Sequence, residues 1–321
     1  MTRDRAMRTA YLLLTVAALA SCRATKAAPV QPVTIRISAG THGGDFDAIA
    51  HEFASTLGLA PGYAAEVQAS AGAVDSIEAV EKSTSDCGFS FSNVAYEAFA
   101  GRLPDEPKSL NRLRGVALVQ VWPLYFLVNR QSSIHGISDL RGRTVAFGVR
   151  GSGTFRAAML VLEAYGIDAR SVNVQEQGFK ESFAQLATQA VDGLFFLAGQ
   201  RSDIVSRAAK YARIMPLSGA PVDRLRERYP FFRPSLIPAQ TYPGQELPVK
   251  TLGLEGLLLC RSDLEARDVR QITKAWFTTL ERAGRSGLIT NAIGPKAAAA
   301  TPIPLHPGAA DYYRARQLLP E

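Results

Sequence analysis

The sequence predicts an α/β protein with two doubly wound lobes, joined by two crossing strands and separated by a ligand cleft. Short β-branched runs alternate with amphipathic helical stretches from Val33 onward, a pattern typical of strand–helix repeats. Glycine-rich loops follow several predicted strands, where open α/β sheets bind ligands. Two long apolar runs, Gly115–Asn129 and Leu252–Cys260, are expected to lead between the lobes. The length of 321 residues suits two modest domains.

The composition is that of an ordinary folded protein. Hydrophobic residues make up 47% and charged residues 20% of the chain, which excludes intrinsic disorder. The three cysteines are too few for a disulfide-dense scaffold or a four-cysteine zinc site. A structural zinc site is therefore not expected, and we also expect no cofactor.

Residues 1–21 are expected to form a lipoprotein signal peptide. Three arginines precede the apolar run Ala10–Ala20, which covers about half of the ~20 residues that a membrane-spanning helix needs. Leu19–Cys22 resembles the bacterial lipobox, in which the cysteine receives a diacylglycerol before cleavage leaves it first. A signal-peptidase cut after Ala20 is the alternative. Either cut exports the protein, and lipidation of Cys22 would anchor it in the periplasm through the tether 22–32.

The charge balance is mildly basic. Removal of residues 1–21, with three arginines and one aspartate, lowers the formal charge from +7 to +5. The remaining basic residues are scattered, without a basic run that has interleaved aromatics. We therefore expect no nucleic-acid partner, whereas an anionic ligand or an anionic membrane surface suits this balance.

Three strand–helix units are expected in the first lobe. Ile49, Ala50 and Phe53 recur at helical spacing after the first glycine-rich loop. In chain order the units are strand Val33–Ser38, a helix from Phe46, strand Tyr63–Ser70, helix Val74–Glu81, strand Cys87–Ser92 and helix Val94–Phe99.

The second lobe repeats this pattern before the chain returns. Its expected elements are strand Thr144–Val149, helix Phe155–Tyr165, strand Ser171–Gln175, helix Lys180–Gln189 and strand Gly193–Leu197. Leu252–Cys260 then leads into the amphipathic helix Ala266–Ala283. The first lobe therefore comprises residues 33–124 and 251–321, and the second comprises 125–250.

Four further residues have expectations of their own. Cys87 and Cys260 lie in apolar strands, where buried thiols and a disulfide both fit. Trp122 and Trp276 are expected to pack in the core, with Trp122 near the crossing between the lobes.

Several motifs stand in a recognisable order along the chain. They are the glycine-rich loop 39–44, Gln68–Val74, Phe89–Tyr96, Gly148–Thr154, Tyr242–Gly244, and Ile303–Ala309 followed by Tyr312 and Tyr313. This order resembles the TAXI solute-binding proteins of tripartite ATP-independent periplasmic (TRAP) transporters, from about Val33 to the C-terminus. The resemblance implies a type II periplasmic-binding fold that closes around a small organic acid or amino acid. It also implies delivery of that ligand to TRAP membrane subunits, driven by an ion gradient.

The glycine-rich loops lie between a strand end and a helix start. Backbone N–H groups and the helix dipole favour an anion there, and nearby hydroxyl and amide side chains add hydrogen bonds. For Gly151–Thr154 a capped helix start without ligand is the alternative, and the resemblance favours a ligand. The candidate ligand-binding residues are Thr41, His42, Gly43, Gly44, Phe46, Gly72, Ala73, Ser92, Asn93, Arg150, Ser152, Gly153 and Thr154.

Two positions depart from the family pattern. Asp45 follows Gly43-Gly44 where many relatives carry a hydroxyl; it either faces the cleft or, as we favour, caps or begins the first helix. Asn93 stands where many relatives carry an aspartate, which removes a negative charge. Arg150 and Arg156 flank the second-lobe loop and either pair with a ligand carboxylate or stay solvated.

The sequence offers no support for catalysis. The loop Gly151–Arg156 lacks the third glycine of a dinucleotide fingerprint, and neither a Walker A lysine nor a Gly-x-Ser-x-Gly elbow is present. Solvation explains the cluster of two histidines and two aspartates between His42 and His51 better than a metal site. We therefore expect a binding protein and no enzyme.

The expected function is capture of a carboxylate-bearing organic anion or amino acid by a monomeric, extracytoplasmic solute-binding protein. The alternative is a ligand-sensing lipoprotein of the same fold, which presents its closed form to a membrane receptor.

Overall fold

The computed structural model describes residues 31–103 and 107–319. From Thr34 onward the chain forms one compact unit. The expected signal peptide, its lipidation site Cys22 and most of the tether lie outside the described residues. Within the described ranges we find no helix whose length and hydrophobicity would allow it to cross a bilayer.

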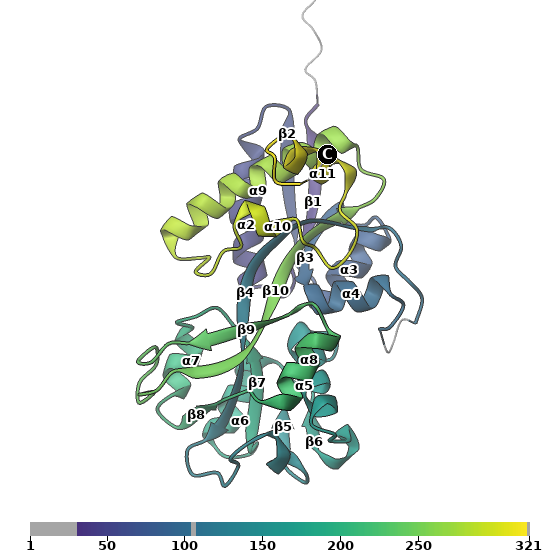
Figure 1. Cartoon of the computed structure of the whole chain (residues 1–321). Coiled ribbons are helices and arrows are strands. Elements are labelled where there is room, and N and C mark those ends of the chain that lie inside the picture. The colour runs from purple at the N-terminus through teal and green to yellow at the C-terminus, as the bar shows by residue number, and fades with distance from the viewer. Residues whose placement is uncertain (1–30, 104–106, 320–321) are drawn as a thin grey trace, which may run out of the picture. The chain divides into compact units, whose positions relative to one another are not determined.

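The elements alternate along the chain as a strand–helix pattern requires (Figure 1). The strands are β1 (Val33–Ser38), β2 (Tyr63–Gln68), β3 (Cys87–Phe91), β4 (Leu113–Asn129), β5 (Thr144–Ala146), β6 (Asn173–Gln175), β7 (Gly193–Leu197), β8 (Ala212–Met215), β9 (Phe232–Ile237) and β10 (Val249–Arg261). The helices are α2 (Asp45–Gly58), α3 (Ala73–Glu81), α4 (Ser92–Phe99), α5 (Gly153–Ala164), α6 (Phe179–Ala187), α7 (Asp203–Ala208), α8 (Ala220–Arg228), α9 (Ala266–Ser286), α10 (Pro295–Ala298) and α11 (Pro307–Arg314). Short 3₁₀ helices cover Ile137–Leu140 and Ala169–Ser171.

The strands form one sheet, in which β4 and β10 run through both parts of the fold (Figure 1). The order is β2-β1-β3-β10-β4-β7-β5-β6, with β8 on β4 and β9 on β10. β4 pairs with β10 up to Pro123 and with β7 from Leu124. We call the part with β1–β3, α2–α4 and α9–α11 the first half, and the part with β5–β8 and α5–α8 the second half. The fold-class prediction is confirmed, whereas the exact lobe boundaries stay a prediction.

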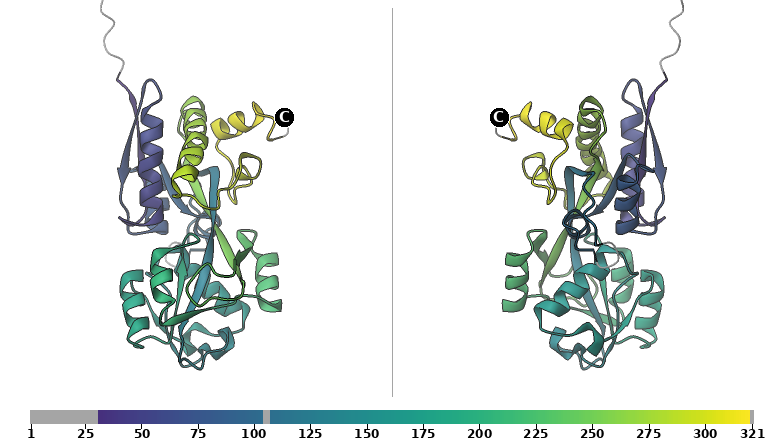
Figure 2. Two further views of the ribbon diagram at one scale, coloured as in Figure 1. Left: turned by 90° about the vertical axis from the view of Figure 1, so that its left-hand side faces the viewer. Right: turned by 90° about the vertical axis from the view of Figure 1, so that its right-hand side faces the viewer.

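Helices cover both faces of the first half, because its strands bury side chains on both sides. Along β10, Leu258 and Cys260 belong to the hydrophobic cluster with α2 and α9, while Leu257 and Leu259 belong to the cluster with α3 and α4. Figure 2 shows α9 between α2 and α11, and α9 contacts both helices. Trp122 and Trp276 are 1% and 0% exposed, so their predicted place in the core is confirmed.

The bounds differ from the prediction mainly in the second half. The strand predicted at Thr144–Val149 ends at Ala146, and the chain turns at Gly148, whose φ of +84° suits glycine. The elements α7, β8, α8 and β9 were not predicted. In β9 an exposed arginine and a proline interrupt the apolar pattern. A strand at the edge of a sheet, as β9 is on β10, tolerates both residues.

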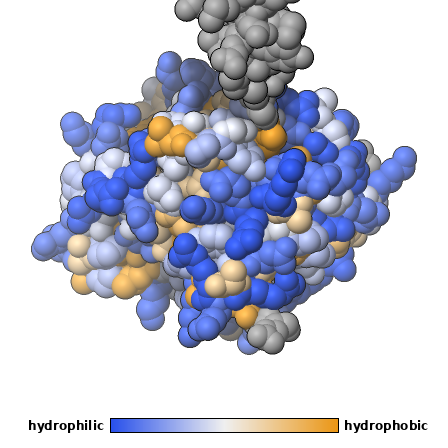
Figure 3. Space-filling model, turned by 90° about the horizontal axis from the view of Figure 1, so that it is seen from above, coloured by the Kyte–Doolittle hydropathy of each residue, from blue (hydrophilic) through white to orange (hydrophobic). Residues whose placement is uncertain are grey.

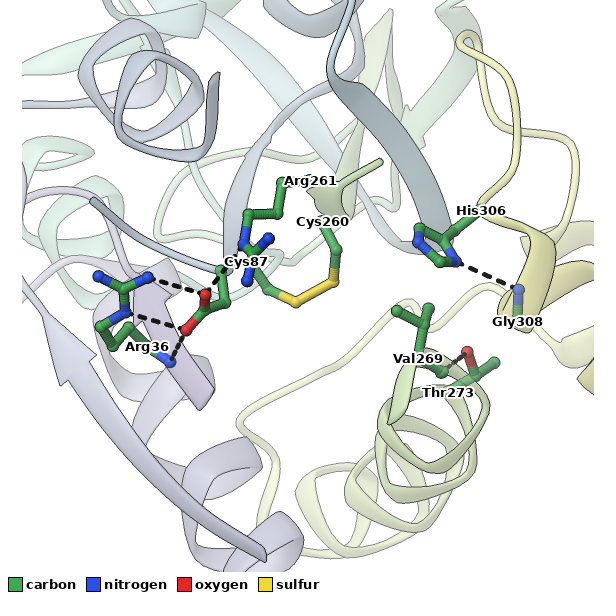
Figure 4. The surroundings of a disulfide bond; sticks show 9 residues. Arg36, Cys87, Cys260, Arg261, Val269, Thr273, His306 and Gly308 are labelled. Atoms are coloured by element: carbon green, nitrogen blue, oxygen red, sulfur yellow. Dashed lines mark hydrogen bonds and ion pairs between the residues drawn. A yellow bond between two sulfur atoms is a disulfide. The ribbon is translucent and has the colours of Figure 1, made fainter. Parts of the chain in front are cut away.

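A disulfide joins Cys87 of β3 to Cys260 of β10, which decides between the two alternatives for these cysteines (Figure 4). They are direct partners in the antiparallel pairing of the two strands. Beside it, the buried carboxylate of Asp86 accepts hydrogen bonds from Arg36 at 2.8 and 3.0 Å and from Arg261 at 3.0 Å. Burial opposes ionisation of this carboxyl, but the arginine hydrogen bonds outweigh burial and hold the pKa of Asp86 below its usual value.

His306 predicts a pH dependence of stability. Its ring is 1% exposed, and Nδ1 accepts a hydrogen bond from the Gly308 N–H at the start of α11 (Figure 4). Burial, and then the positive charge of Arg114, lower the pKa of His306. The unfolded chain therefore binds the proton first, so stability falls as the pH drops below about 6.5 and levels off below the folded pKa, by at most about 1.4 kcal/mol per pH unit.

The test compares urea unfolding of the wild type and His306→Asn between about pH 7.5 and pH 5. Asparagine also caps a helix, so the variant should keep α11 while its stability falls less at acidic pH. His135→Asn, at an exposed position, is the control and should follow the wild type. Parallel pH profiles for all three proteins would contradict this role of His306.

Candidate functional site

The glycine-rich starts of α3 and α5, one from each half, contact each other. The backbone N–H of Val74 donates to the carbonyl of Gly151 at 3.2 Å. The side-chain amide of Asn93 donates to the carbonyl of Gly153 at 3.3 Å. These contacts are single, long hydrogen bonds, so each contributes little to holding the two halves together.

A cavity of about 290 Å³ lies beside this contact. Its lining residues are Ala71, Gly72, Val74, Asp75, Glu78 and Leu103 from the first half and Arg150, Gly151, Phe155 and Arg156 from the second. Both halves therefore supply the walls, as expected for a small-molecule site between lobes. Of the predicted site residues, Gly72 and Arg150 line it.

Two arginines give the second-half wall its charge. Arg150 pairs with Glu176 at 2.5 Å, with its side chain 58% exposed, and its guanidinium lies 5.5 Å from the centre of the Phe155 ring. Arg156 forms two hydrogen bonds with Glu97 of α4, at 2.7 and 2.8 Å. The second pair is buried and links the two halves, whereas the first is open to solvent.

The acids of the cavity have partners of their own. Asp75 accepts a hydrogen bond from the Ala71 N–H at 2.8 Å, and Glu78 pairs with Lys82 at 2.6 Å. The acidic side chains of the cavity thus lie on the α3 wall and the basic ones on the α5 wall. Such a division suits a ligand with an acid group at one end.

The first residues of α5 are capped and covered. The Ser152 hydroxyl accepts from the Phe155 N–H at 3.1 Å, which caps the helix, and Thr154 is half-buried next to Gly148. Gly153 lies against the Phe91 ring, which any side chain at that position would overlap. The Phe91 ring thus covers the start of α5, where the sequence predicted an anion-binding loop. The open space of the cavity lies at Arg150 and Gly151 instead.

Phe91 belongs to an aromatic cluster at the crossing of the halves. Its ring centre lies 4.9 Å from that of Phe46 and 5.5 Å from that of Trp122. The Trp122 indole N–H donates to the Asp45 carboxylate at 2.7 Å. Asp45 is the first residue of α2, in agreement with the favoured interpretation, and its carboxylate also fixes this cluster.

The loop 41–44 does not reach the cavity. Thr41, His42 and Gly43 are exposed, and Gly44 precedes α2 as its N-cap. Asp47 accepts from the Gly43 N–H at 2.8 Å and lies 3.1 Å from His42 and 3.5 Å from His51. No three histidine, cysteine or acidic side chains are grouped to hold a metal in the part of the chain that the structure describes.

The remaining predicted residues lie under the contact between the halves. Ala73, Ser92 and Asn93 are buried, and the Ser92 hydroxyl donates to the Glu255 carbonyl at 2.8 Å. Asn93 Oδ1 is buried with no hydrogen-bond partner among the described residues. These side chains therefore shape the contact and do not line the cavity.

Sequence reasoning missed several lining residues, among them Val74, Asp75, Glu78, Leu103 and Phe155. Each lies on an ordinary helix face or loop, so neither spacing nor composition distinguishes it. The carboxylate partners of the two arginines, Glu97 and Glu176, gave no signal either, because they are 59 and 26 residues away in sequence.

Solved structures share this fold. The alkanesulfonate-binding protein SsuA from Xanthomonas axonopodis pv. citri, bound to MOPS, is 18% identical, with 92% of this chain and 96% of that chain covered and a TM-score of 0.51. PhnD1 from Prochlorococcus marinus, in complex with methylphosphonate, is 12% identical over 89% of this chain and 99% of its own, with a TM-score of 0.55. The periplasmic binding protein BugD is 12% identical over 91% and 95%, with a TM-score of 0.55. At these identities the likeness shows a periplasmic-binding-protein fold.

The sequence also matches a family model directly. The match to the NMT1-like family covers residues 37–315, from β1 to the last helical turns. Because it spans almost the whole described chain, this protein belongs to the NMT1-like family.

Proposed function

We propose that this chain is an extracytoplasmic solute-binding protein that captures a small organic anion in the cavity between its two halves. The observation that carries the proposal is the cavity itself, because both halves line it and Arg150 holds an exposed ion pair there. An exposed ion pair contributes little to stability. A ligand anion can therefore replace Glu176 on the Arg150 guanidinium at low cost.

The ligand that we propose has a carboxylate, or an acid group of similar shape, on a small apolar body. Carboxylates, sulfonates and phosphonates all present two or more oxygens to the parallel N–H donors of a guanidinium. Val74, Leu103 and Phe155 supply the apolar walls. On the opposite wall, Asp75 and Glu78 would suit the ammonium group of an amino acid.

Closure of the two halves around this ligand is the proposed mechanism, and the ligand leaves unchanged. Binding shifts the population from an open to a closed state, because only the closed state brings both walls to the ligand. The contact between Val74 and Gly151 is one that such a motion would make and break.

The partner that we propose is a TRAP-type membrane component, on the basis of the TAXI resemblance. One sulfonate-binding relative, from Methylobacillus flagellatus, is described instead as a putative ABC-transporter protein. Uptake into proteoliposomes separates the two, since the first requires an ion gradient and the second requires ATP. If neither an ion gradient nor ATP drives uptake of the ligand, the sensor alternative is favoured.

Ligand capture is expected to raise the unfolding temperature. A ligand at about 100 times its Kd adds about 2.7 kcal/mol, which means a rise on the order of 5 °C for a chain of this size. The measurement is thermal unfolding of residues 23–321 with alkanesulfonates, phosphonates, dicarboxylates and amino acids. The proposal fails if none of them shifts the transition and mass spectrometry of the denatured protein finds no copurified ligand.

Arg150→Gln should weaken binding of the ligand class that raises the unfolding temperature. The expected loss of affinity is about tenfold to a hundredfold, which is the range for a lost charged hydrogen bond. The matched control is Arg170→Gln in the same half, whose exposed ion pair with Asp168 is also 2.5 Å long. Equal losses in the two variants, measured by calorimetry, would remove Arg150 from the site.

A further inference from the structure

The groove between α9 and α11 carries an excess of positive charge. It has a volume of about 690 Å³. Its basic lining residues are Arg267, Arg270, Lys274 and Arg316. One acid, Asp311, also lines it, and that carboxylate pairs with Arg314 at 2.7 Å. The groove therefore presents cations that its own acid does not neutralise.

Of these four cations, Arg267 alone pairs with a carboxylate of the described residues, that of Asp268 at 3.3 Å. Spacings of three and four residues place Arg267, Arg270 and Lys274 on one face of α9. Within the described ranges, no carboxylate oxygen lies within 4.0 Å of a basic nitrogen of Arg270, Lys274 or Arg316. Arg316 lies 4.9 Å from the centre of the Tyr312 ring, which holds it along the wall of the groove.

An exposed apolar turn adjoins the same helix. Leu59 is 72% exposed, and it lines a second hollow together with Ala60, Pro61 and Lys274. Lys274 therefore belongs to both hollows. A surface that combines cations with a protruding apolar side chain is typical of proteins that lie at a membrane interface. We call these four cations and Leu59 the α9–α11 surface.

The chain enters the fold at the end where α9 begins (Figure 1). The Ala39 N–H donates to the Gln68 carbonyl and the Ser70 N–H to the Gly40 carbonyl, so β1 and β2 end together. The two strands are parallel and therefore also begin at the same end of the sheet. At that end the Tyr63 hydroxyl donates to Asp268 in the first turn of α9, at 2.8 Å. Figure 3 looks onto this end of the fold, where hydrophilic residues surround scattered hydrophobic ones.

The expected lipid on Cys22 would keep this end close to a bilayer. The tether 22–32 spans at most about 40 Å when fully extended. The start of α9 and the start of β1, where the tether attaches, thus lie at the same end of the fold, and this end comes close to the headgroups. Electrostatic attraction then acts over a Debye length of about 8–10 Å.

We propose that the α9–α11 surface docks the protein onto a bilayer that contains anionic phospholipids. The lipid phosphates accept hydrogen bonds from the arginines and lysine, and Leu59 inserts between headgroups. Each basic residue near such a surface strengthens binding about fivefold. This docking does not depend on the ligand that the cavity captures.

The experiment measures co-sedimentation of residues 23–321, which retain the whole compact unit but carry no lipid, with phospholipid vesicles. Binding to phosphatidylcholine vesicles with added phosphatidylglycerol is expected at low salt, with loss of binding at high salt. Pure phosphatidylcholine should bind little. The triple variant Arg270→Gln, Lys274→Gln, Arg316→Gln should bind roughly a hundredfold more weakly.

The matched control removes three exposed cations from the second half, as Lys180→Gln, Arg207→Gln, Lys210→Gln. It has the same net charge as the first triple variant, and it should bind like the wild type. Equal weakening by both triples would mean that net charge alone drives binding and would overturn the proposal. Absence of binding by the wild type, or equal binding to neutral vesicles, would overturn the proposal too and would leave the groove to a protein. Displacement by glycerol phosphate would overturn it in favour of a small anion.

Discussion

Replacing both Cys87 and Cys260 by alanine is expected to lower the free energy of unfolding by roughly 5 kcal/mol. The disulfide closes a loop of 173 residues, and the entropy that it removes from the unfolded chain grows with loop length. Urea unfolding under oxidising conditions measures the effect as a lower midpoint.

Wild-type protein refolded with excess dithiothreitol is the control, because it lacks the bond but keeps both side chains. It should unfold close to the double variant. An unchanged midpoint in the double variant would show that the bond does not form in solution. The bond joins β3 directly to β10, so its loss is also expected to loosen the segment that leads into α4 and the contact between the halves.

Replacing Glu97 by glutamine is expected to shift the unliganded protein toward the open state by a factor of roughly 10 to 100. Glu97 and Arg156 are 5% and 15% exposed, and their pair links α4 of the first half to α5 of the second. The variant leaves Arg156 without its counter-charge in the closed state, where burial makes that loss costly. In the open state water solvates the guanidinium, so the cost falls on closure alone.

Small-angle scattering and distances between labels on the two halves measure this shift. The control is Glu163→Gln, which removes a 2.8 Å ion pair with Arg228 inside the second half. That pair is exposed, and its loss should leave the scattering unchanged. The affinity for an identified ligand should fall with the closed fraction in the Glu97 variant only. Identical scattering for the wild type and Glu97→Gln would show that the pair of Glu97 and Arg156 does not stabilise the closed state.

Local patterns predicted the secondary structure well in elements whose own sequence shows which side chains are buried. β1 and β7 have the predicted bounds, and α9 begins at the predicted Ala266. Strands β8 and β9 escaped prediction because they are short edge strands, whose apolar residues depend on the partner strand and not on their own alternation.

The candidate site was predictable only in part. Gly72 and Arg150 were found because a glycine-rich helix start has a recognisable local pattern. The cover that Phe91 forms on Gly153 was not predicted, since the same strand-end aromatic packs equally well in a core. The negative wall of the cavity was not predicted either, because exposed acids on α3 look like any solvated helix face.

The sequence by itself determined what is read along the chain, namely the alternation of strands and helices and the two crossing runs, while the export signal with Cys22 stays a prediction of the same kind. Each follows from neighbouring residues, through periodic burial or through a linear segment that an enzyme recognises. Only the tertiary structure decided the state of Cys87 and Cys260, the partners of Arg150 and Arg156, and the meeting of α3 with α5. Those contacts join residues far apart in sequence, and burial, charge and hydrogen bonding select among them only after the strands have taken their places in the sheet.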